Sequence, residues 1–214
     1  MNPTKKQLQE KYGDEQVFVV PMLSAQHIAD KFSEARQYLQ CNDDLLTLQE
    51  WDAKGRYVFR HDAEYNEALQ QLIPYILITD TTGEKFYISR RIAGGARLTG
   101  VLSLGFGGHI NPIDGTTNVI MNGFERELNE EVFIKRKKAP VEFLGYVRDL
   151  NSPTKEHIGF VMMVKARYVK IKEENVLEGF WMTLPELVDN YHRFESLAKH
   201  IIDYLFITRQ KKLA

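Results

Sequence analysis

Cysteine is nearly absent from this sequence, since Cys41 is the only one among 214 residues. One cysteine cannot form a disulfide within the chain or supply a zinc site built from several cysteines. A chain without disulfides suits a reducing compartment, so we expect a cytoplasmic protein. The first residues also lack the apolar stretch that a secretory signal needs, which favours the same expectation.

The sequence also lacks a charge surplus and long apolar runs. Lys and Arg number 28 against 29 Asp and Glu, which gives a net charge of -1. Without a basic surplus we expect no nucleic-acid partner. No run approaches the roughly 18 apolar residues of a membrane helix, so we expect no membrane partner. With 43% hydrophobic and 27% charged residues, the composition is that of an ordinary globular protein.

Glycine, in contrast, is concentrated in one segment. Eight of the 14 glycines fall between residues 94 and 123, namely Gly94, Gly95, Gly100, Gly105, Gly107, Gly108, Gly115 and Gly123. Glycine permits backbone angles and close approaches that other residues resist. We therefore expect this segment to need bare backbone for a specific purpose.

Strand-like runs occupy the middle of the chain, and helical patterns flank them. We expect strands at 17–20, 75–79, 85–90, 141–148, 157–168 and 180–183, with a hairpin turn at 80–84. We expect helices at 24–39, 62–72, 119–133, 184–187 and 194–208. The strand at 157–168 is predicted to be central, because residues 160–164 are apolar on both faces. This order favours an α/β (α+β) sandwich around a mixed sheet.

The predicted helix at 119–133 carries both an apolar stripe and a group of acids. Phe124 and Leu128 mark the stripe, which continues to the end of the helix. Glu127, Glu130 and Glu131 are spaced i, i+3 and i+4, so their carboxylates converge within one turn. A divalent cation would offset their repulsion, and oxygen ligands suit Mg²⁺ or Mn²⁺. A solvated helix face with ion pairs is the alternative explanation of the same run.

Two further residues of this helix have expected roles. Gly123 lies one turn before Glu127, where a side chain would crowd the approach to the carboxylates. A glycine inside a helix costs about 1 kcal/mol relative to alanine, so its presence needs a reason. Arg126 is placed to pair with neighbouring carboxylates and to fix their rotamers.

The acidic run resembles a known motif. Arg126-Glu-Leu-Asn-Glu-Glu131 is similar to the Arg-Glu-x-x-Glu-Glu core of the Nudix box, and Gly107-Gly108 is similar to the glycine pair that opens it. Phe143-Leu-Gly-Tyr and the segment 178–187 resemble later parts of the family. The closest resemblance is to an uncharacterised bacterial group of predicted phosphoesterases of the Nudix family, which share a stretch like Ser103-Leu-Gly-Phe-Gly-Gly-His-Ile-Asn111.

The resemblance to Nudix (MutT-type) hydrolases implies a fold and an activity. The fold would be an α/β/α sandwich around a mixed sheet, with residues 1–72 as an N-terminal extension packed on the core and residues 73–214 as the catalytic domain. The activity would be divalent-metal-dependent hydrolysis of a phosphoanhydride bond in a nucleoside diphosphate linked to another moiety. Mg²⁺, or else Mn²⁺, would be the cofactor. The partner would be a small-molecule nucleotide, and a homodimer is compatible with the resemblance.

Carried over residue by residue, the resemblance also implies a metal set. Glu127, Glu130 and Glu131 would bind the metal together with the Gly107 carbonyl. Arg126 would orient the glutamates, so that Glu127, Arg126 and Glu130 form the catalytic group. Glu127 is one candidate for the general base that removes a proton from water. Other branches of the family place the base on a later loop, for which the candidates are Glu173, Glu174 and Glu178.

Substrate contacts are assigned to the glycine loop and to one strand end. The backbone of Gly108 would hold phosphate, and His109 would touch phosphate or act in acid–base chemistry. Hydrogen bonding of His109 to backbone is the alternative. Arg90, Arg91 and Arg97 lie before the glycine loop, and of these we assign Arg90 to the anionic substrate and the other two to solvated surface.

The sequence departs from the usual box in three places. Four extra residues lie between Gly108 and Arg126, centred on residues 111–117. Asn118 stands where the box has its earlier glutamate, Asp114 is the nearest upstream acid, and Phe133 replaces a glycine. These departures favour a second hypothesis, a Nudix-fold nucleotide-binding or regulatory module without turnover. A third, an isoprenoid isomerase on the same fold, ranks last because it relies on a cysteine near the glycine region and Cys41 is far upstream.

Overall fold

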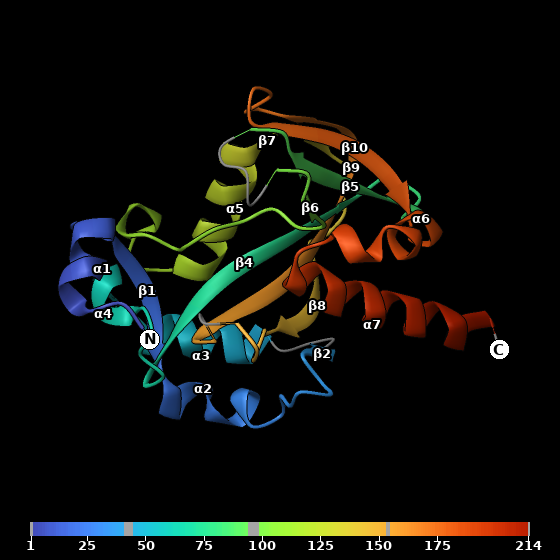
Figure 1. The fold of residues 1–214 in the computed structure, drawn as a ribbon. Helices are drawn as coiled ribbons and strands as arrows, with labels where there is room; N and C mark the ends of the chain where they lie inside the picture. The colour runs from blue at the N-terminus through green and yellow to red at the C-terminus, as the bar shows by residue number, and fades with distance from the viewer. Residues whose placement is uncertain (1, 41–44, 94–98, 153–154, 214) are drawn as a thin grey trace.

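The computed structural model describes residues 2–40, 45–93, 99–152 and 155–213 (Figure 1). Gly94, Gly95, Arg97 and Cys41, which the sequence singled out, lie outside these residues. Within them the strands are β1 (Gln16–Pro21), β2 (Tyr38–Gln40), β3 (Arg56–Phe59), β4 (Leu69–Thr79), β5 (Lys85–Arg91), β6 (Leu102–Ser103), β7 (Val132–Arg136), β8 (Glu142–Val147), β9 (His157–Ile171) and β10 (Leu177–Thr183). The helices are α1 (Lys5–Tyr12), α2 (Met22–Ala29), α3 (Leu45–Lys54), α4 (Arg60–Ala63), α5 (Val119–Glu131), α6 (Leu184–Asp189) and α7 (Ser196–Leu213), with 3-10 turns η1 (Pro112–Asp114) and η2 (Tyr191–Arg193).

The described strands form one mixed sheet. Its main path runs β10-β5-β4-β9-β8-β2. Off this path, β1 pairs with β4, β3 with β1, β6 with β5 and β7 with β9. Strands β4 and β9 are parallel, and the other pairs are antiparallel. The predicted mixed sheet and the central position of β9 are therefore confirmed.

Two apolar layers cover the two faces of the sheet. One face carries α2, α3 and α5, and buried residues such as Trp51, Phe124 and Phe160 join these helices to the strands. The other face carries α6 and α7, where Leu187 and Ile201 meet the strands. Figure 1 shows α5 and α7 on opposite sides of the long central strand β4. The α/β/α sandwich expected from the resemblance is confirmed.

The helix expected at 62–72 is wrong, because pairing within the sheet overrides the helical propensity of this segment. Helix α4 ends at Ala63, Glu64 is extended, and Tyr65 has a φ of 61°. The Tyr65 amide donates to a carboxylate oxygen of Glu156 at 2.8 Å, which fixes the turn. The chain then enters β4, whose first half pairs with β1 and with β9.

The helix expected at 24–39 is correct only in its first part. Helix α2 ends at Ala29, and residues 38–40 form β2, which pairs with β8. Of the remaining expected elements, the strand at 75–79 begins six residues earlier, at Leu69, and the helix at 194–208 ends five residues later, at Leu213. The others match within three residues at each end. The expected hairpin joins β4 and β5, and there Asp80 accepts from the Gly83 and Glu84 amides. Helices α1 and α3 and strands β3 and β7 were not expected.

Residues 1–72 contribute strands to the same sheet as the rest of the chain. Strand β1 pairs with β4, and the Phe18 amide donates to the Ile110 carbonyl at 2.8 Å. The expected boundary between residues 72 and 73 falls inside β4, and the division into an extension and a catalytic domain stays a prediction. Among the described residues, none of the helices combines the length and apolarity needed to cross a membrane.

Candidate active site

Helix α5 begins and ends where tertiary contacts and backbone geometry dictate. Its first turn is capped from another element, since the Ile120 amide donates to a carboxylate oxygen of Asp52 at 3.0 Å. Asn118 precedes it in the left-handed conformation, with a φ of 51° and no side-chain cap. Phe124 and Leu128 are fully buried, as the apolar stripe predicts. After Glu131 the chain becomes extended and enters β7.

The glycine pair before α5 is required by two close approaches. Gly107 has a φ of +147°, and a Cβ atom there would lie 1.8 Å from the Pro74 carbonyl oxygen on β4. A Cβ atom on Gly108 would lie 2.8 and 2.9 Å from the two carboxylate oxygens of Glu127. The loop is therefore pressed against β4 on one side and against Glu127 on the other, which only glycine permits without a shift.

Arg126 connects the acids of the helix. One terminal nitrogen lies 2.9 Å from Glu127 Oε1 and 2.8 Å from Glu130 Oε2. Its Nε lies 2.8 Å from Asp114 Oδ1, and the other terminal nitrogen donates to the His109 carbonyl at 2.8 Å. A guanidinium offers five donors in a fixed plane, so these contacts hold the helix, the loop and two glutamates in one arrangement.

Glu127 is the most buried of the three glutamates on α5. The residue is 7% exposed, and burial raises its pKa to about 7. The nearby Arg126 opposes this rise, whereas Glu130 and Glu131 add to it. The pKa of Glu131 is also raised, first by burial and next by Glu173, while Arg91 acts against the rise. Buried carboxylates with raised pKa values lack enough positive charge around them.

Beside α5 lies a pocket of about 270 Å³. Glu131, Gly107 and Arg91 are among the residues that line it, so the end of α5 and the glycine loop share one pocket with a strand arginine. Arg90 is instead paired with Glu178 on the neighbouring strand β10. Successive residues of a strand point to opposite faces, which explains why Arg91 and Ser89 border the pocket and Arg90 does not.

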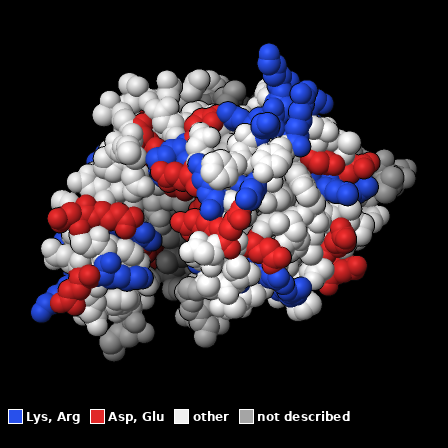
Figure 2. Space-filling model, turned by 90° about the horizontal axis from the view of Figure 1, so that it is seen from above, with Lys and Arg blue, Asp and Glu red and all other residues white. Residues whose placement is uncertain are grey.

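The later acids are placed differently from one another. The Lys172 amide donates to the Glu131 carbonyl at 3.0 Å, which places Glu173 near the end of α5, and Glu173 raises the pKa of Glu131. Glu174 is paired with Lys170, and Glu178 is paired with Arg90. On the face shown in Figure 2, acidic and basic side chains interleave around the hollows of the surface. Of the three candidates for a base outside the helix, Glu173 is therefore the one beside an α5 carboxylate.

The role expected for Gly123 is wrong. A Cβ atom there would lie 2.8 Å from Ile110 and 3.3 Å from the Asp114 carboxylate. Gly123 therefore makes room for the extra loop and leaves the glutamates untouched.

The extra loop itself docks on the first part of the chain. The Tyr57 hydroxyl donates to the Gly115 carbonyl at 2.8 Å, and the Asn111 amide group donates to the Gln16 carbonyl at 2.8 Å.

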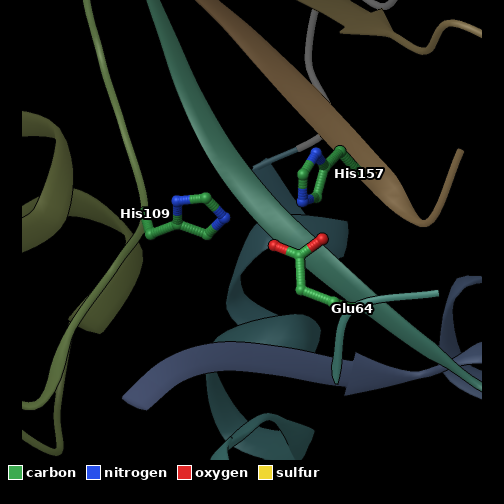
Figure 3. A group of neighbouring side chains, drawn as sticks. All are labelled: Glu64, His109 and His157. Atoms are coloured by element: carbon green, nitrogen blue, oxygen red, sulfur yellow. The ribbon is translucent and has the colours of Figure 1, made fainter. Parts of the chain in front are cut away.

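His109 points away from the pocket. Its ring forms a T-shaped contact with His157, with ring centroids 5.2 Å apart, and both rings face Glu64 (Figure 3). Burial lowers the pKa of His109 to about 3 and that of His157 to about 4, and the positive Arg60 acts in the same direction on both. Both imidazoles are therefore neutral at physiological pH.

The structure thus brings together part of the residue set taken from the sequence. Arg126 joins Glu127 and Glu130, and the pocket joins Glu131 and Gly107, while Gly108 touches Glu127. His109 and Arg90 lie in other surroundings.

Sequence reasoning did not assign Arg91 to the pocket, nor a role to Glu64 or His157. The alternation along β5 is the signal that separates Arg91 from Arg90, once the face of the strand is known. Glu64 and His157 carry no local signal, because only the turn after α4 and the pairing of β9 bring them to His109.

Comparison with known proteins identifies related chains. No protein-family model matches this sequence. Protein YmaB of Bacillus subtilis (strain 168) is 32% identical over 206 residues, which cover 90% of this chain and 98% of YmaB. The crystal structure of Tm1382, described as "a putative Nudix hydrolase", matches with a TM-score of 0.73 and 28% identity, over 89% of this chain and 98% of Tm1382. DR0079 from Deinococcus radiodurans matches at a TM-score of 0.50 and 15% identity, over 69% of this chain and 90% of DR0079, a likeness of fold alone.

Proposed function

Because this chain belongs to the Nudix hydrolase superfamily, we propose that it is a divalent-metal-dependent hydrolase. Its substrate would be a nucleoside diphosphate linked to another moiety, cleaved at a phosphoanhydride bond. The observation that carries the proposal is the position of Glu131 and Gly107 in one pocket with Arg91, directly beside the Arg126 network. The cytoplasmic location and the homodimer stay predictions from the sequence.

The donor set of α5 fits Mg²⁺ or Mn²⁺. Glu127, Glu130 and Glu131 offer carboxylate oxygens, and Gly107 offers a carbonyl, which are the hard ligands that these ions prefer. Burial raises the pKa of Glu127 despite the nearby Arg126, so a bound cation would stabilise its charged form. When bound, the cation would neutralise phosphate charge and lower the pKa of an attacking water.

The protein's own residues would position the substrate and the water. Arg91 supplies a positive charge inside the pocket, where it can contact a diphosphate. Gly108 presents bare backbone beside the Glu127 carboxylate. Arg126 holds the carboxylates of Glu127 and Glu130, whereas Glu131 lines the pocket. Arg90 and His109 stay predictions as substrate contacts, and the geometry favours Arg91 in their place.

Two groups can remove the proton from the attacking water. Glu127 has a pKa of about 7, near the pH at which a general base works best. Glu173 lies beside Glu131 and is the candidate outside the helix. A base that also binds metal would have its pKa lowered by the cation, which favours Glu173 if Glu127 is a ligand.

The proposal is tested by an activity screen with Mg²⁺ and with Mn²⁺. The substrates are nucleoside triphosphates, ADP-ribose, dinucleoside polyphosphates, NADH and coenzyme A. We expect hydrolysis of at least one, and a loss of at least about 100-fold in Glu130→Gln and Glu131→Gln with the fold retained. The matched control is Glu125→Gln on the same helix, whose carboxylate pairs with Arg136, and which should keep its activity.

One observation supports the second hypothesis, a nucleotide-binding module without turnover. Asn118, at the position of the missing glutamate, is exposed and contributes no side-chain cap to α5. A wild type that is inactive across the whole panel, yet binds a nucleotide in a metal-dependent way, would favour this hypothesis over hydrolysis.

A further inference from the structure

Two histidines and one glutamate from distant parts of the chain meet behind the glycine loop. Glu64 follows α4, His109 follows the glycine pair, and His157 begins β9. One ligand atom from each lies within 4.8 Å of the other two. Figure 3 shows the two rings and the carboxylate pointing toward one common point.

The atoms that meet there are buried and unsatisfied. Glu64 is 5% exposed, and its Oε2 has no hydrogen-bond partner. The Nε2 atoms of His109 and His157 are equally shielded and also lack partners. A buried polar atom without a partner costs about 1–3 kcal/mol, so three such atoms at one point call for a bound group.

The local charges allow a cation at this point. Arg60 lies 3.0 Å from Glu64 Oε1, so the guanidinium occupies one carboxylate oxygen and leaves Oε2 to the histidines. A terminal nitrogen of Arg60 also lies 3.0 Å from Glu15 Oε1, and this second carboxylate offsets the Arg60 charge. Glu156, fully buried and one residue before His157, adds a second acid near Glu64. The unpartnered Nε2 atoms of the two imidazole rings complete the set of donors.

We propose that Glu64, His109 and His157 bind one divalent transition-metal ion, with Zn²⁺ as the ion that we expect to bind well. Two imidazoles and one carboxylate form a donor set found for zinc, whereas Mg²⁺ prefers oxygen ligands alone. Ligand atoms around Zn²⁺ lie about 3.3 Å apart at its usual bond lengths of about 2.0–2.1 Å, so the three side chains need to close slightly. This site is distinct from the α5 carboxylates and does not depend on hydrolytic activity.

A metal at this point would join three segments that no covalent bond connects. It would tie the turn after α4 to the glycine loop and to the start of β9. His109 directly follows Gly108, whose backbone lies against Glu127. Because the ligand atoms are shielded from solvent, the ion would act as a structural clamp on the loop and would not contact substrate.

The test is a titration of the metal-free full chain with Zn²⁺, measured by calorimetry. Excess Mg²⁺ is present throughout, so that sites built from oxygen ligands are already filled. We expect one Zn²⁺ per chain, and a rise in Tm on binding. Co²⁺ used in place of Zn²⁺ should give a visible spectrum of a site with nitrogen ligands. His109→Gln and His157→Gln should each lower the Zn²⁺ affinity by at least about 100-fold.

Three further variants make the outcome decisive. Glu64→Gln keeps an oxygen that accepts from Arg60 and should fold even if a histidine variant does not, yet it should bind Zn²⁺ more weakly. His200→Gln removes another buried, unpartnered Nε2 on α7 and should leave the affinity unchanged. Glu131→Gln should also leave it unchanged. The proposal is overturned if the wild type shows no saturable Zn²⁺ binding. It is also overturned if both histidine variants bind Zn²⁺ as the wild type does, because the ion then lies elsewhere.

Discussion

Asp114 holds Arg126 through two parallel contacts, from Nε to Oδ1 at 2.8 Å and from a terminal nitrogen to Oδ2 at 3.0 Å. Asp114 is 4% exposed and also accepts from the Asn111 amide at 2.9 Å. The extra loop therefore supplies the acid that pairs with Arg126, four positions upstream of Asn118.

Asp114→Asn should weaken both the fold and the site. An asparagine offers one acceptor in place of two and leaves the Arg126 charge with less compensation, which costs about 3 kcal/mol for a buried pair. Urea unfolding measures this loss. Thr116→Ala, at an exposed position of the same loop, is the control and should change stability by less than about 0.5 kcal/mol. Equal stability of Asp114→Asn and wild type would show that the pair is not needed.

Alanine at the two adjacent glycines should have different effects. Gly107→Ala places a Cβ atom against rigid backbone at a φ of +147°, so we expect a loss of about 3 kcal/mol or more in unfolding free energy. Gly108→Ala meets the movable end of Glu127, so stability should fall by about 1 kcal/mol or less. Its Mn²⁺ affinity should nevertheless fall about tenfold, because the carboxylate is displaced. Urea unfolding and Mn²⁺ titration of both variants separate the two effects, and the opposite order of stabilities would contradict the geometry.

The contribution of Glu127 to the stability of the metal-free protein should fall as pH rises from about 4.5 to 7, whereas the lowered pKa values of His109 and His157 act in the opposite direction. The folded-state pKa of Glu127, about 7, lies above its ordinary value of 4.5, so the folded chain binds the extra proton in this range. The stabilisation is complete below the lower value and is lost as pH passes the higher one, with at most about 3 kcal/mol involved.

Unfolding in urea with a chelator at several pH values measures this dependence. The stability of the wild type relative to Glu127→Gln should fall across this range, because the histidines act on both proteins and cancel in the difference. Mg²⁺ should restore stability at pH 8 in the wild type more than in the variant. A difference between the two proteins that stays level from pH 5 to 8 would show that Glu127 ionises at its ordinary pKa.

Arg91 and Arg90 form a matched pair for testing substrate contact. Arg91 lines the pocket, whereas Arg90 is paired with Glu178. A hydrogen bond to a charged group is worth about 1.5–3 kcal/mol, so Arg91→Ala should raise KM by roughly 10-fold to 100-fold. Arg90→Ala should stay within about 2-fold. Steady-state kinetics with a substrate from the activity screen measures both KM values. A larger rise of KM in Arg90→Ala than in Arg91→Ala would assign the substrate contact to Arg90.

The local part of the site could be predicted from the sequence. The spacing of Glu127, Glu130 and Glu131 follows from helical periodicity, and the glycine pair before α5 marks a close approach of backbone. The bounds of α5 agree with the prediction within two residues. These features depend on residues that are near one another in the chain.

The rest of the site depends on pairing between distant segments. The segment 62–72 has the composition of a helix, but its second half is drawn into β4 by β1 and β9. That pairing alone sets Glu64 beside His157. The role of Gly123 was also misjudged, because the path of the extra loop over α5 cannot be deduced from helical periodicity.

The parallel pairing of β4 with β9 has a consequence for the order of folding. Gln71 pairs with His157 and Thr79 pairs with Lys165, so the central ladder joins segments that lie 86 residues apart in the chain. The entropy of closing so long a loop is lost before these contacts form, which makes such topologies slow to fold. Helix α5 with its glutamates can form early from local contacts. The cluster of Glu64, His109 and His157 behind the glycine loop is completed only when β4 pairs with β9.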